Sequence, residues 1–516
     1  MIDAERAAAL IADYGSPMYV YDLDRVRRAL SDLRDTVPAG ATVLYSLKAN
    51  PHIDLVRTLL AGGCQAEVSS SGELATALAA GADPAEMFYT GPGKTAVEVR
   101  TAIAAGVGTF SVESLVDLER VAEAARSLGR VVDCALRVNG ADAPGGAGMR
   151  MTGEASQFGA DVEVLLSLRD ALRAVSGVRL AGFHFFPLTN AYDEHSLVAE
   201  MRGSIATAAT LAEALGIEVR VLDLGGGFGC PFAKEGERPR YPGLREPVTA
   251  ALDERFPAWR SGGTRVFFES GRHLVGDSGT LLCTVSDVKD SRGSRFAVLD
   301  TGINHLGGLS GIGRLLPLSA TALPFPAGGG DDSPAVKTRL VGPLCTPADT
   351  LGRGAADVPP VRVGQTLAIP NVGAYGATAS LIGFLSRPGA AEVVVSGGSV
   401  VSASRLCLVR EPIAKPVKSV EPGKSVEAVE SVEAAMETAV WDERFAAVLT
   451  EALPRLSPVR ADASLRAAGL DSLALVDLLV RLEEAYDVTI SDDDLSQEAF
   501  ATPASLWGVV SAALAR

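Results

Sequence analysis

A lysine at the end of a short β-prone run is the first candidate for chemistry in this chain. Residues 42–45 (Thr-Val-Leu-Tyr) have the composition of a buried strand, and Asn50-Pro51 turns the chain directly afterwards. Lys48 therefore falls at the C-terminal end of a strand. An isolated lysine there usually extends its amine to solvent. In a pocket that depresses its pKa, the amine would instead form a Schiff base.

Three further segments carry residues that suit a catalytic site. Residues 223–229 (DLGGGFG) follow a strand-like run, and their glycines let backbone N–H groups converge on an anion, although a tight turn uses glycine equally well. Glu269 and Arg272 (ESGR) end another strand-like run, where they could bridge to each other. Cys345, within residues 342–349 (GPLCTPAD), has the alternative of being a small buried residue.

The elements that position these residues alternate between strand-like and helix-like runs from residue 22 to about residue 270. Eight βα-type steps predict a parallel α/β barrel (TIM-like) over residues 25–270. The expected strands are residues 42–45, 65–68, 87–89, 108–112, 133–138, 180–186, 219–223 and 266–269. Because chemistry in such a barrel belongs at the C-terminal ends of the strands, Lys48, the glycine run and Glu269 fall at one end of it.

The pattern changes after Gly271. Short β-prone runs punctuated by Gly and Pro predict a mostly antiparallel β domain over residues 271–410. Residues 411–439 hold charged near-repeats without a sustained apolar face and predict a linker, with a weakly packed helix as the alternative. Residues 440–516 predict a small helical bundle that carries 13 acidic residues, 6 arginines and no lysine.

Composition limits the class of protein. A chain of 516 residues with 47% hydrophobic residues predicts two to four units with a large core. The formal net charge of −16 argues against a nucleic-acid partner, which would need a basic surface. No secretory signal or membrane-spanning run is evident. The six cysteines have no metal-ligand spacing, so we expect no metal site and a reduced, cytoplasmic protein.

The segment around Lys48 (YSLKAN) resembles the YxxKAN segment of the fold type III, alanine-racemase-like pyridoxal-phosphate enzymes. The resemblance is close to the diaminopimelate and ornithine decarboxylase group. The resemblance covers roughly residues 15–410, with many motifs in the same order. It implies that Lys48 carries pyridoxal 5′-phosphate. It also implies that residues 1–24 join the β domain, since the strand at residues 17–21 belongs there in the family.

The same resemblance implies roles for other residues. The loop with Gly225, Gly226 and Gly227 would bind the cofactor phosphate, near Gly271 and Arg272. Glu269 would face the pyridine nitrogen. A carboxylate there keeps the nitrogen protonated, so the ring can accept the electron pair left when carbon dioxide departs, which favours decarboxylation over racemisation. Further family matches that would bind cofactor or substrate are Glu67, Arg137, Tyr375 (GAYG) and Asp349. Cys345 would protonate Cα in the neighbouring subunit's active site, so a homodimer with shared sites is implied.

Some positions depart from the family pattern. Thr346 stands where diaminopimelate enzymes carry a glutamate for the distal amine of the substrate, which puts diaminopimelate in doubt. Phe186 takes the place of the histidine that stacks on the cofactor ring; a phenyl ring can stack but donates no proton. Thr189 occupies the position of a phosphate-binding serine, and Glu67 replaces an aspartate. His184 is expected to be a core histidine.

The C-terminal segment resembles an acyl carrier protein. Ser472, within residues 469–473 (GLDSL), precedes an amphipathic run at residues 474–486 and would accept a 4′-phosphopantetheine arm, although a helix cap would also use a serine here. Together these features predict a decarboxylase fused to a four-helix carrier domain, similar to decarboxylases of carrier-bound glutamate in secondary metabolism. A phosphopantetheinyl transferase, a carrier-loading ligase and an acyl-transferring enzyme would be its partners.

Two alternatives remain at this level. The first is a decarboxylase of free diamino acids whose carrier collects the product. The second is a degenerate barrel that acts as a scaffold for the carrier. The intact Lys48, Glu269 and Cys345 speak against the scaffold.

Overall fold

The structure is a computed structural model that separates into two compact units, Met1–Pro412 and Ile413–Arg516. It describes residues 3–140, 149–150, 156–307, 320–324, 334–352 and 354–410 of the first unit. Of the second unit it describes residues 441–453, 456, 459–461, 463–465, 468, 478, 481–482, 485–486, 488 and 502–514. The predicted linker at 411–439 lies outside the described residues.

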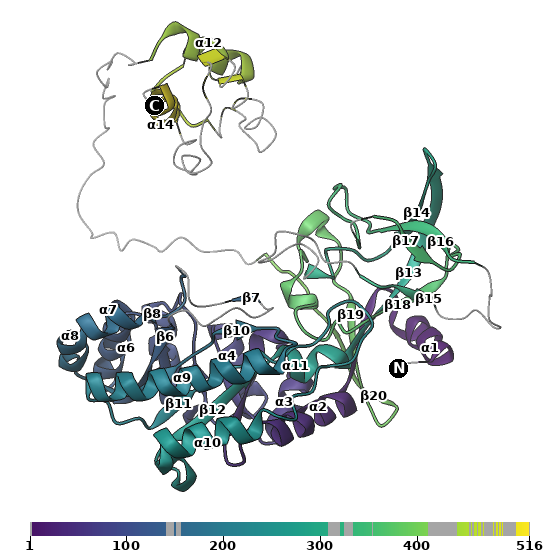
Figure 1. Cartoon of the computed structure of the whole chain (residues 1–516). Helices are drawn as coiled ribbons and strands as arrows, with labels where there is room; N and C mark the ends of the chain where they lie inside the picture. The colour runs from purple at the N-terminus through teal and green to yellow at the C-terminus, as the bar shows by residue number, and fades with distance from the viewer. Residues whose placement is uncertain are drawn as a thin grey trace, which may run out of the picture. The chain divides into compact units, whose positions relative to one another are not determined.

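A closed barrel of eight parallel strands forms the first part of unit one, as the alternating pattern predicts (Figure 1). In chain order, each strand pairs with the one that follows it, and the last strand returns to the first. The strands are β2 (Thr42–Ser46), β3 (Gln65–Val68), β4 (Phe88–Tyr89), β5 (Thr109–Val112), β6 (Val132–Asn139), β9 (Val178–His184), β11 (Val221–Asp223) and β12 (Arg265–Ser270).

Helices cover the outside of this barrel, with α9 and α10 visible along one side in Figure 1. They are amphipathic: α6, for example, buries Leu118, Val121 and Ala125 on one face and starts at a Ser114 cap. The helices of this part are α2 (Leu23–Thr36), α3 (Ile53–Ala61), α4 (Ser71–Ala79), α5 (Ala96–Ala105), α6 (Leu115–Ser127), α7 (Val162–Ser167), α8 (Arg169–Ala174), α9 (Glu194–Leu215), α10 (Arg245–Arg255) and α11 (Arg272–Val275).

Two short pairings lie beside the barrel strands. Strand β8 (Ala160–Asp161) pairs with the end of β6, and β7 (Met149–Arg150) pairs antiparallel with β10 (Leu188–Thr189). The sequence pattern did not predict either pairing. Thr189 therefore lies on an extra strand that follows β9.

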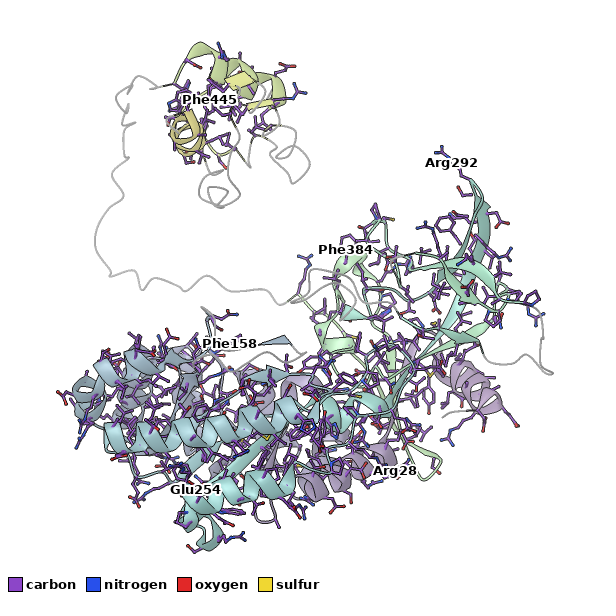
Figure 2. All side chains as sticks on the ribbon, in the orientation of Figure 1. Arg28, Phe158, Glu254, Arg292, Phe384 and Phe445 are labelled. Atoms are coloured by element: carbon purple, nitrogen blue, oxygen red, sulfur yellow. The ribbon has the colours of Figure 1, made fainter. Side chains whose placement is uncertain are left out.

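The β domain is a second nine-stranded sheet with both parallel and antiparallel pairs. Strand β1 lies in its centre, antiparallel to β13 and parallel to β19, and β14 is parallel to β16; its other pairs are antiparallel. Arg292 marks the tip of the β13–β14 hairpin in Figure 2. Its elements are α1 (Ala4–Tyr14), β1 (Met18–Asp22), β13 (Gly279–Ser291), β14 (Ser294–Leu299), β15 (Leu323–Pro324), β16 (Val336–Val341), β17 (Ala356–Val358), β18 (Thr366–Pro370), β19 (Ala391–Ser396) and β20 (Ser399–Arg405).

The second unit has its own apolar core. Helices α12 (Glu443–Ala452) and α14 (Pro503–Leu514) bury Phe445, Leu449 and Leu506 against each other. Leu478 and Leu482, which are helical, join this core. Ser472 lies outside the described residues. Across the part of the chain that the structure describes, no helix combines the length and apolar character needed to cross a membrane.

Candidate active site

Lys48 lies just past the C-terminal end of β2, in a short 3₁₀ turn over Leu47–Ala49. Its Nζ is 3.1 Å from Glu67 Oε2 and 3.9 Å from Glu269 Oε2, and both carboxylates are buried. Desolvation alone would lower the lysine pKa. The two carboxylates outweigh it and hold the pKa above its ordinary value. About 42% of the side chain is accessible, and this surface faces the interior of a pocket.

That pocket gathers residues from several strand ends and from the β domain. Its described lining consists of Ser46, Lys48, Phe186, Thr189, Asn190, Gly227, Phe228, Glu269, Ser270, Gly271, Arg272 and Tyr375. Eight of these residues were predicted from the sequence as cofactor-binding. Ser46, Asn190, Phe228 and Ser270 were not, although each adjoins a predicted residue or its strand end.

The glycine loop after β11 presents bare backbone to this pocket. Gly225 and Gly227 have φ of 67° and 91°, values that disfavour a side chain. A Cβ on Gly226 would overlap the carbonyl oxygen of Glu269, and one on Gly227 would lie 2.9 Å from Leu188 O. Asp223 Oδ1 holds the turn by accepting a hydrogen bond from the Gly225 N–H at 2.7 Å. Such a loop suits the close approach of an anionic group.

A cation and a tyrosine from two domains meet beside this loop. The Arg272 guanidinium lies 4.6 Å from the centre of the Tyr375 ring. The Tyr375 N–H donates to Ala49 O at 2.7 Å, and Asn50 Nδ2 donates to Gly373 O at 2.9 Å. The β domain is thus tied directly to the Lys48 segment. Glu269 and Arg272 take different partners, so they do not form the bridge that was the alternative for this motif.

Phe186 lies where an aromatic ring could cover a flat ligand. Its ring centre is 5.6 Å from Lys48 Nζ, and its Cδ2 would be 3.0 Å from a Cβ on Gly225. This ring has no proton to give. Any proton movement on that face must come from other groups.

Arg137 is held beside the pocket rather than in its lining. Its Nη1 is 2.9 Å from Glu113 Oε1, and both side chains are buried. The other Glu113 oxygen accepts the Gly159 N–H at 2.9 Å, while the Phe158 ring lies 4.8 Å from the guanidinium carbon. The pair therefore fixes residues 158–159 at the barrel rim. Glu113 was not predicted as a site residue from the sequence, although it directly follows the C-terminal end of β5.

Glu73 is a second missed carboxylate near Lys48. Its Oε2 accepts the Ser69 N–H at 2.7 Å. Burial, and then the charge of Glu67, raises the pKa of Glu73 to about 7. The sequence signal was its position shortly after the end of β3, in the first turn of α4.

The loop that carries Cys345 contributes no residue to the described lining of the Lys48 pocket. Cys345 is exposed and Thr346 half-buried, and neither lines that pocket. Asp349 is 3% exposed, and its two oxygens accept the N–H groups of Ile303 and Leu344 at 2.8 and 2.7 Å. Backbone groups of the β domain thus occupy this carboxylate.

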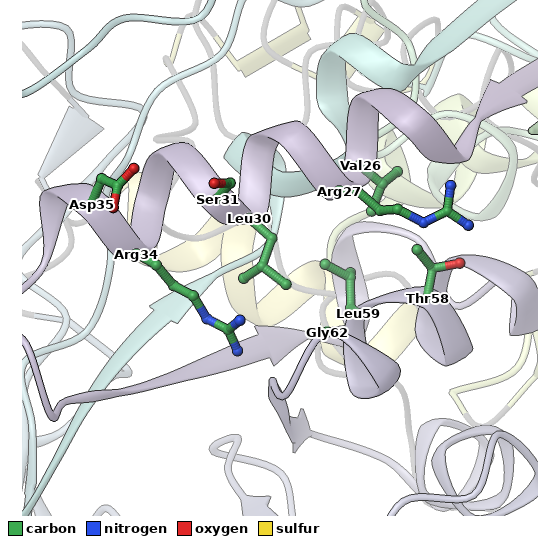
Figure 3. A pocket seen from close by; sticks show the side chains of 9 residues that line it. All are labelled: Val26, Arg27, Leu30, Ser31, Arg34, Asp35, Thr58, Leu59 and Gly62. Atoms are coloured by element: carbon green, nitrogen blue, oxygen red, sulfur yellow. The ribbon is translucent and has the colours of Figure 1, made fainter. Parts of the chain in front are cut away.

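Another hollow lies on the outer surface of the barrel between α2 and α3 (Figure 3). Leu30 and Leu59 form its floor, and Arg27 and Arg34 border it. It shares no lining residue with the Lys48 pocket. We assign it no chemistry.

Comparisons with known proteins identify the family. The family model described as "Pyridoxal-dependent decarboxylase, pyridoxal binding domain" matches residues 23–276. The chain is 30% identical over 407 residues to L-glutamyl-[BtrI acyl-carrier protein] decarboxylase of Niallia circulans, covering 77% of this chain and 93% of that protein. The chain belongs to the pyridoxal-dependent decarboxylases. It is an amino-acid decarboxylase whose barrel binds pyridoxal 5′-phosphate.

Other relatives agree with the family and the fold. Diaminopimelate decarboxylase of Zymomonas mobilis is 31% identical over 396 residues, with 75% of this chain and 89% of that protein covered. The crystal structure of diaminopimelate decarboxylase from Helicobacter pylori with L-lysine has a TM-score of 0.65 and 25% identity, and covers 75% of this chain and 93% of that one. Membership of this family, with Lys48, Glu269 and Cys345 intact, argues against the scaffold alternative.

The C-terminal unit carries a second cofactor. A family model described as "Phosphopantetheine attachment site" matches residues 443–509. It spans Ser472, which lies outside the described residues. The chain therefore combines a pyridoxal-phosphate decarboxylase with a phosphopantetheine-bearing carrier domain.

The residues of the Lys48 pocket fit the cofactor of this family. The Lys48 amine suits the cofactor aldehyde, and the buried Glu269 carboxylate suits its ring nitrogen. The Phe186 ring can cover the face of the cofactor ring. The glycine loop beside Arg272 suits the phosphate. Bound pyridoxal phosphate supplies an electron sink for the electron pair left when a carboxylate departs as carbon dioxide.

Proposed function

We propose that this chain decarboxylates an amino acid that is attached to its own carrier domain through the side-chain carboxyl group, as in a γ-glutamyl thioester. The observation that carries the proposal is the carrier domain in the same chain as the decarboxylase barrel. The Niallia circulans relative, an L-glutamyl-[acyl-carrier protein] decarboxylase, supports it. For glutamate the product would be a 4-aminobutyryl thioester, in a secondary-metabolite pathway of the cytoplasm.

The chemistry of the reaction sets the point of attachment. The substrate needs a free α-amine to react at the cofactor and a free α-carboxylate to lose as carbon dioxide. Neither group is available for the thioester, so a side-chain carboxyl must form it. Tethering in cis raises the effective concentration of the substrate at the active site to the millimolar range, provided that the linker is long enough for the carrier to reach that site.

The pocket composition supports a substrate without a distal amine. Of the described residues that line it, Glu269 alone is acidic, and Lys48 and His184 already contact that carboxylate. Thr346 offers no charge to a distal ammonium group. A tethered acyl chain needs no such partner.

Within this proposal each pocket residue has a role. Lys48 holds the cofactor and Glu269 keeps its ring nitrogen protonated, while Glu67 orients the lysine amine. Phe186 stacks on the ring. The phosphate is bound by the loop with Gly225, Gly226 and Gly227, together with Gly271 and three side chains: Thr189, Arg272 and Tyr375.

We further propose a homodimer in which Cys345 protonates Cα in the partner subunit's site, with Thr346 and Asp349 on the same loop. The exposed position of Cys345 outside its own pocket supports this. So does a group of exposed apolar side chains on two adjacent segments of the β domain, which a second copy would cover. They are Leu381, Phe384 (marked in Figure 2), Leu385, Leu406, Leu408 and Val409.

The carrier domain implies partners outside the chain. A phosphopantetheinyl transferase would modify Ser472, a ligase would load the amino acid, and a downstream acyl-transferring enzyme would remove the product. The acidic charge of the carrier unit suits recognition by basic surfaces on these enzymes.

The test follows the mass of the carrier segment. Holo-protein loaded with γ-glutamyl thioester should lose one carbon dioxide, and Lys48→Ala protein loaded in the same way should not. The protein should decarboxylate the free amino acid poorly. Efficient turnover of a free amino acid by Ser472→Ala protein, with no change in any loaded thioester, would refute the proposal.

That refuting outcome would support the second candidate, a decarboxylase of free diamino acids. The diaminopimelate decarboxylases among the relatives favour it. Thr346 argues against it, because a distal amine would lack its carboxylate partner.

A further inference from the structure

Three buried polar side chains meet beneath the cofactor pocket. His184 Nε2 is 3.1 Å from Glu269 Oε1. One nitrogen of His184 and one oxygen each of Glu269 and Asp223 lie within 4.8 Å of one another. All three residues are at most 1% exposed. Within the described chain, His184 Nε2, Glu269 Oε1 and Asp223 Oδ2 are buried without a hydrogen bond of good geometry. Because buried polar atoms are rarely left without partners, we expect these three residues to pair with one another.

The histidine contact decides where its proton lies. Burial lowers the pKa of His184, so the ring is neutral and carries one N–H. If Nδ1 held this proton, the Nε2 lone pair would face the Glu269 carboxylate without solvent between them. Ser111 Oγ lies 2.7 Å from Nδ1 and can donate to it instead. The N–H is thus on Nε2, the ring nitrogen nearest to Glu269, and a small rotation of the ring would complete a series of hydrogen bonds from Ser111 through His184 to Glu269.

The aspartate adds a second donor to the same carboxylate. Two carboxylates in one buried site cannot both be ionised. Burial and the charge of Glu269 raise the pKa of Asp223, whereas Lys48 and His184 outweigh burial and lower that of Glu269 to about 2. The proton therefore stays on Asp223. Its Oδ1 accepts from Gly225 N, which leaves Oδ2–H for Glu269.

We propose that Ser111, His184 and a protonated Asp223 are positioning residues that hold Glu269 as an anion with Oε2 free for the ring nitrogen of the cofactor. The three ligand atoms have the spacing of a metal site. However, the Lys48 ammonium already lies 3.9 Å from Glu269 and competes with any cation there. The group also links β5, β9, β11 and β12, so the glycine loop and Glu269 share one support.

The test measures cofactor binding and not turnover. Apo-protein variants are titrated with pyridoxal phosphate, and the dissociation constant and absorbance maximum are recorded. His184→Phe removes the donor, so affinity should fall roughly tenfold and the absorbance band should shift. His184→Gln keeps a donor near the Nε2 position and should restore most of the affinity. Asp223→Asn is matched to a protonated carboxyl and should bind within about threefold of the parent.

The outcomes that overturn the proposal are equally specific. His184→Phe protein with the parent's affinity and spectrum would do so. So would Asp223→Asn protein that binds as weakly as Asp223→Ala, because the carboxyl would then act as an anion. If His184→Phe fails to fold, Ser111→Ala tests the proposal instead. We expect this variant to bind pyridoxal phosphate more weakly at an unchanged Tm. Unchanged binding would rule out the series of hydrogen bonds from Ser111 to Glu269. Ser204→Ala, a buried serine of α9, is the matched control.

Discussion

Asp349 Oδ2 accepts a hydrogen bond from the Leu344 N–H at 2.7 Å, one residue before Cys345. The other oxygen accepts from Ile303 N at 2.8 Å. The carboxylate also lies so close to Gly302 and Gly342 that a Cβ on either glycine would overlap it. In this chain Asp349 therefore fixes the backbone of the Cys345 loop through these hydrogen bonds. The family resemblance predicted a contact with substrate.

Asp349→Ala should destabilise the β domain, because two buried N–H groups lose a charged acceptor. We expect a loss of about 2–4 kcal/mol, seen as a lower Tm in thermal unfolding. Asp357→Asn, at an exposed and weakly paired position, is the control and should change the Tm little. A raised KM for Asp349→Ala with an unchanged Tm would instead support direct substrate binding.

Lys48→Ala should abolish the covalent bond between protein and cofactor. The parent protein should show a visible absorbance band, and borohydride should fix the cofactor irreversibly on Lys48, as peptide mass spectrometry can locate. Lys337→Ala, an exposed lysine of β16, should retain the band. A reducible covalent cofactor in Lys48→Ala protein would rule out this assignment.

Cys345→Ala and Lys48→Ala should each be nearly inactive, but a mixture should recover activity. If the site is shared across a dimer, a heterodimer of the two variants contains one intact site with both residues. At equal amounts and random exchange, about a quarter of the parent's sites should be active. Failure to recover activity after verified subunit exchange would place Cys345 outside the partner's site.

His273 should make the fold sensitive to acid. Its Nδ1 is 2.9 Å from Gly229 O, which can only accept, so Nδ1 carries the proton. Its Nε2 then accepts from Arg238 Nη1 at 3.1 Å. Burial and the Arg238 charge lower the pKa of His273 to about 4. The unfolded chain, with an ordinary histidine pKa near 6.5, binds more protons than the native one between these values.

Stability from this group is therefore full above about pH 6.5 and is lost as the pH falls toward 4. Replacing the group by His273→Gln should flatten the dependence of Tm on pH in this window, whatever its effect on the Tm itself. His195→Gln, at an exposed position on α9, should leave the slope unchanged. An identical slope for His273→Gln and the parent would contradict the assignment.

The barrel could be predicted because each strand is a short apolar run between helical runs. The run at 133–138 became β6 (Val132–Asn139), and that at 266–269 became β12 (Arg265–Ser270). Because Lys48, the glycine loop and Glu269 fall at the C-terminal ends of predicted strands, they could be placed at the same end of the barrel. The motifs also brought Arg272 and Tyr375 to this rim from separate parts of the chain.

Partners that depend on three-dimensional placement could not be predicted. Nothing in the local sequence says that Glu113 pairs with Arg137, because β5 and β6 must first lie side by side. His184 was expected to be a core histidine, and it is buried, but its contact with Glu269 requires β9 and β12 to converge on β11. Whether Asp349 faces a substrate or its own loop depends on the path of residues 302–303, far away in sequence.

Strand β1 also has a consequence for synthesis of the chain on the ribosome. Met18 pairs with Ala391, about 370 residues later, and β1 is buried between β13 and β19. At roughly 5–20 residues per second, the segment Met-Tyr-Val-Tyr must wait on the order of tens of seconds for its second neighbour. The barrel can close during this time, but the β domain cannot. An apolar strand with unpaired edges is therefore exposed in the nascent chain, which is the stage at which chaperone binding or aggregation competes with folding.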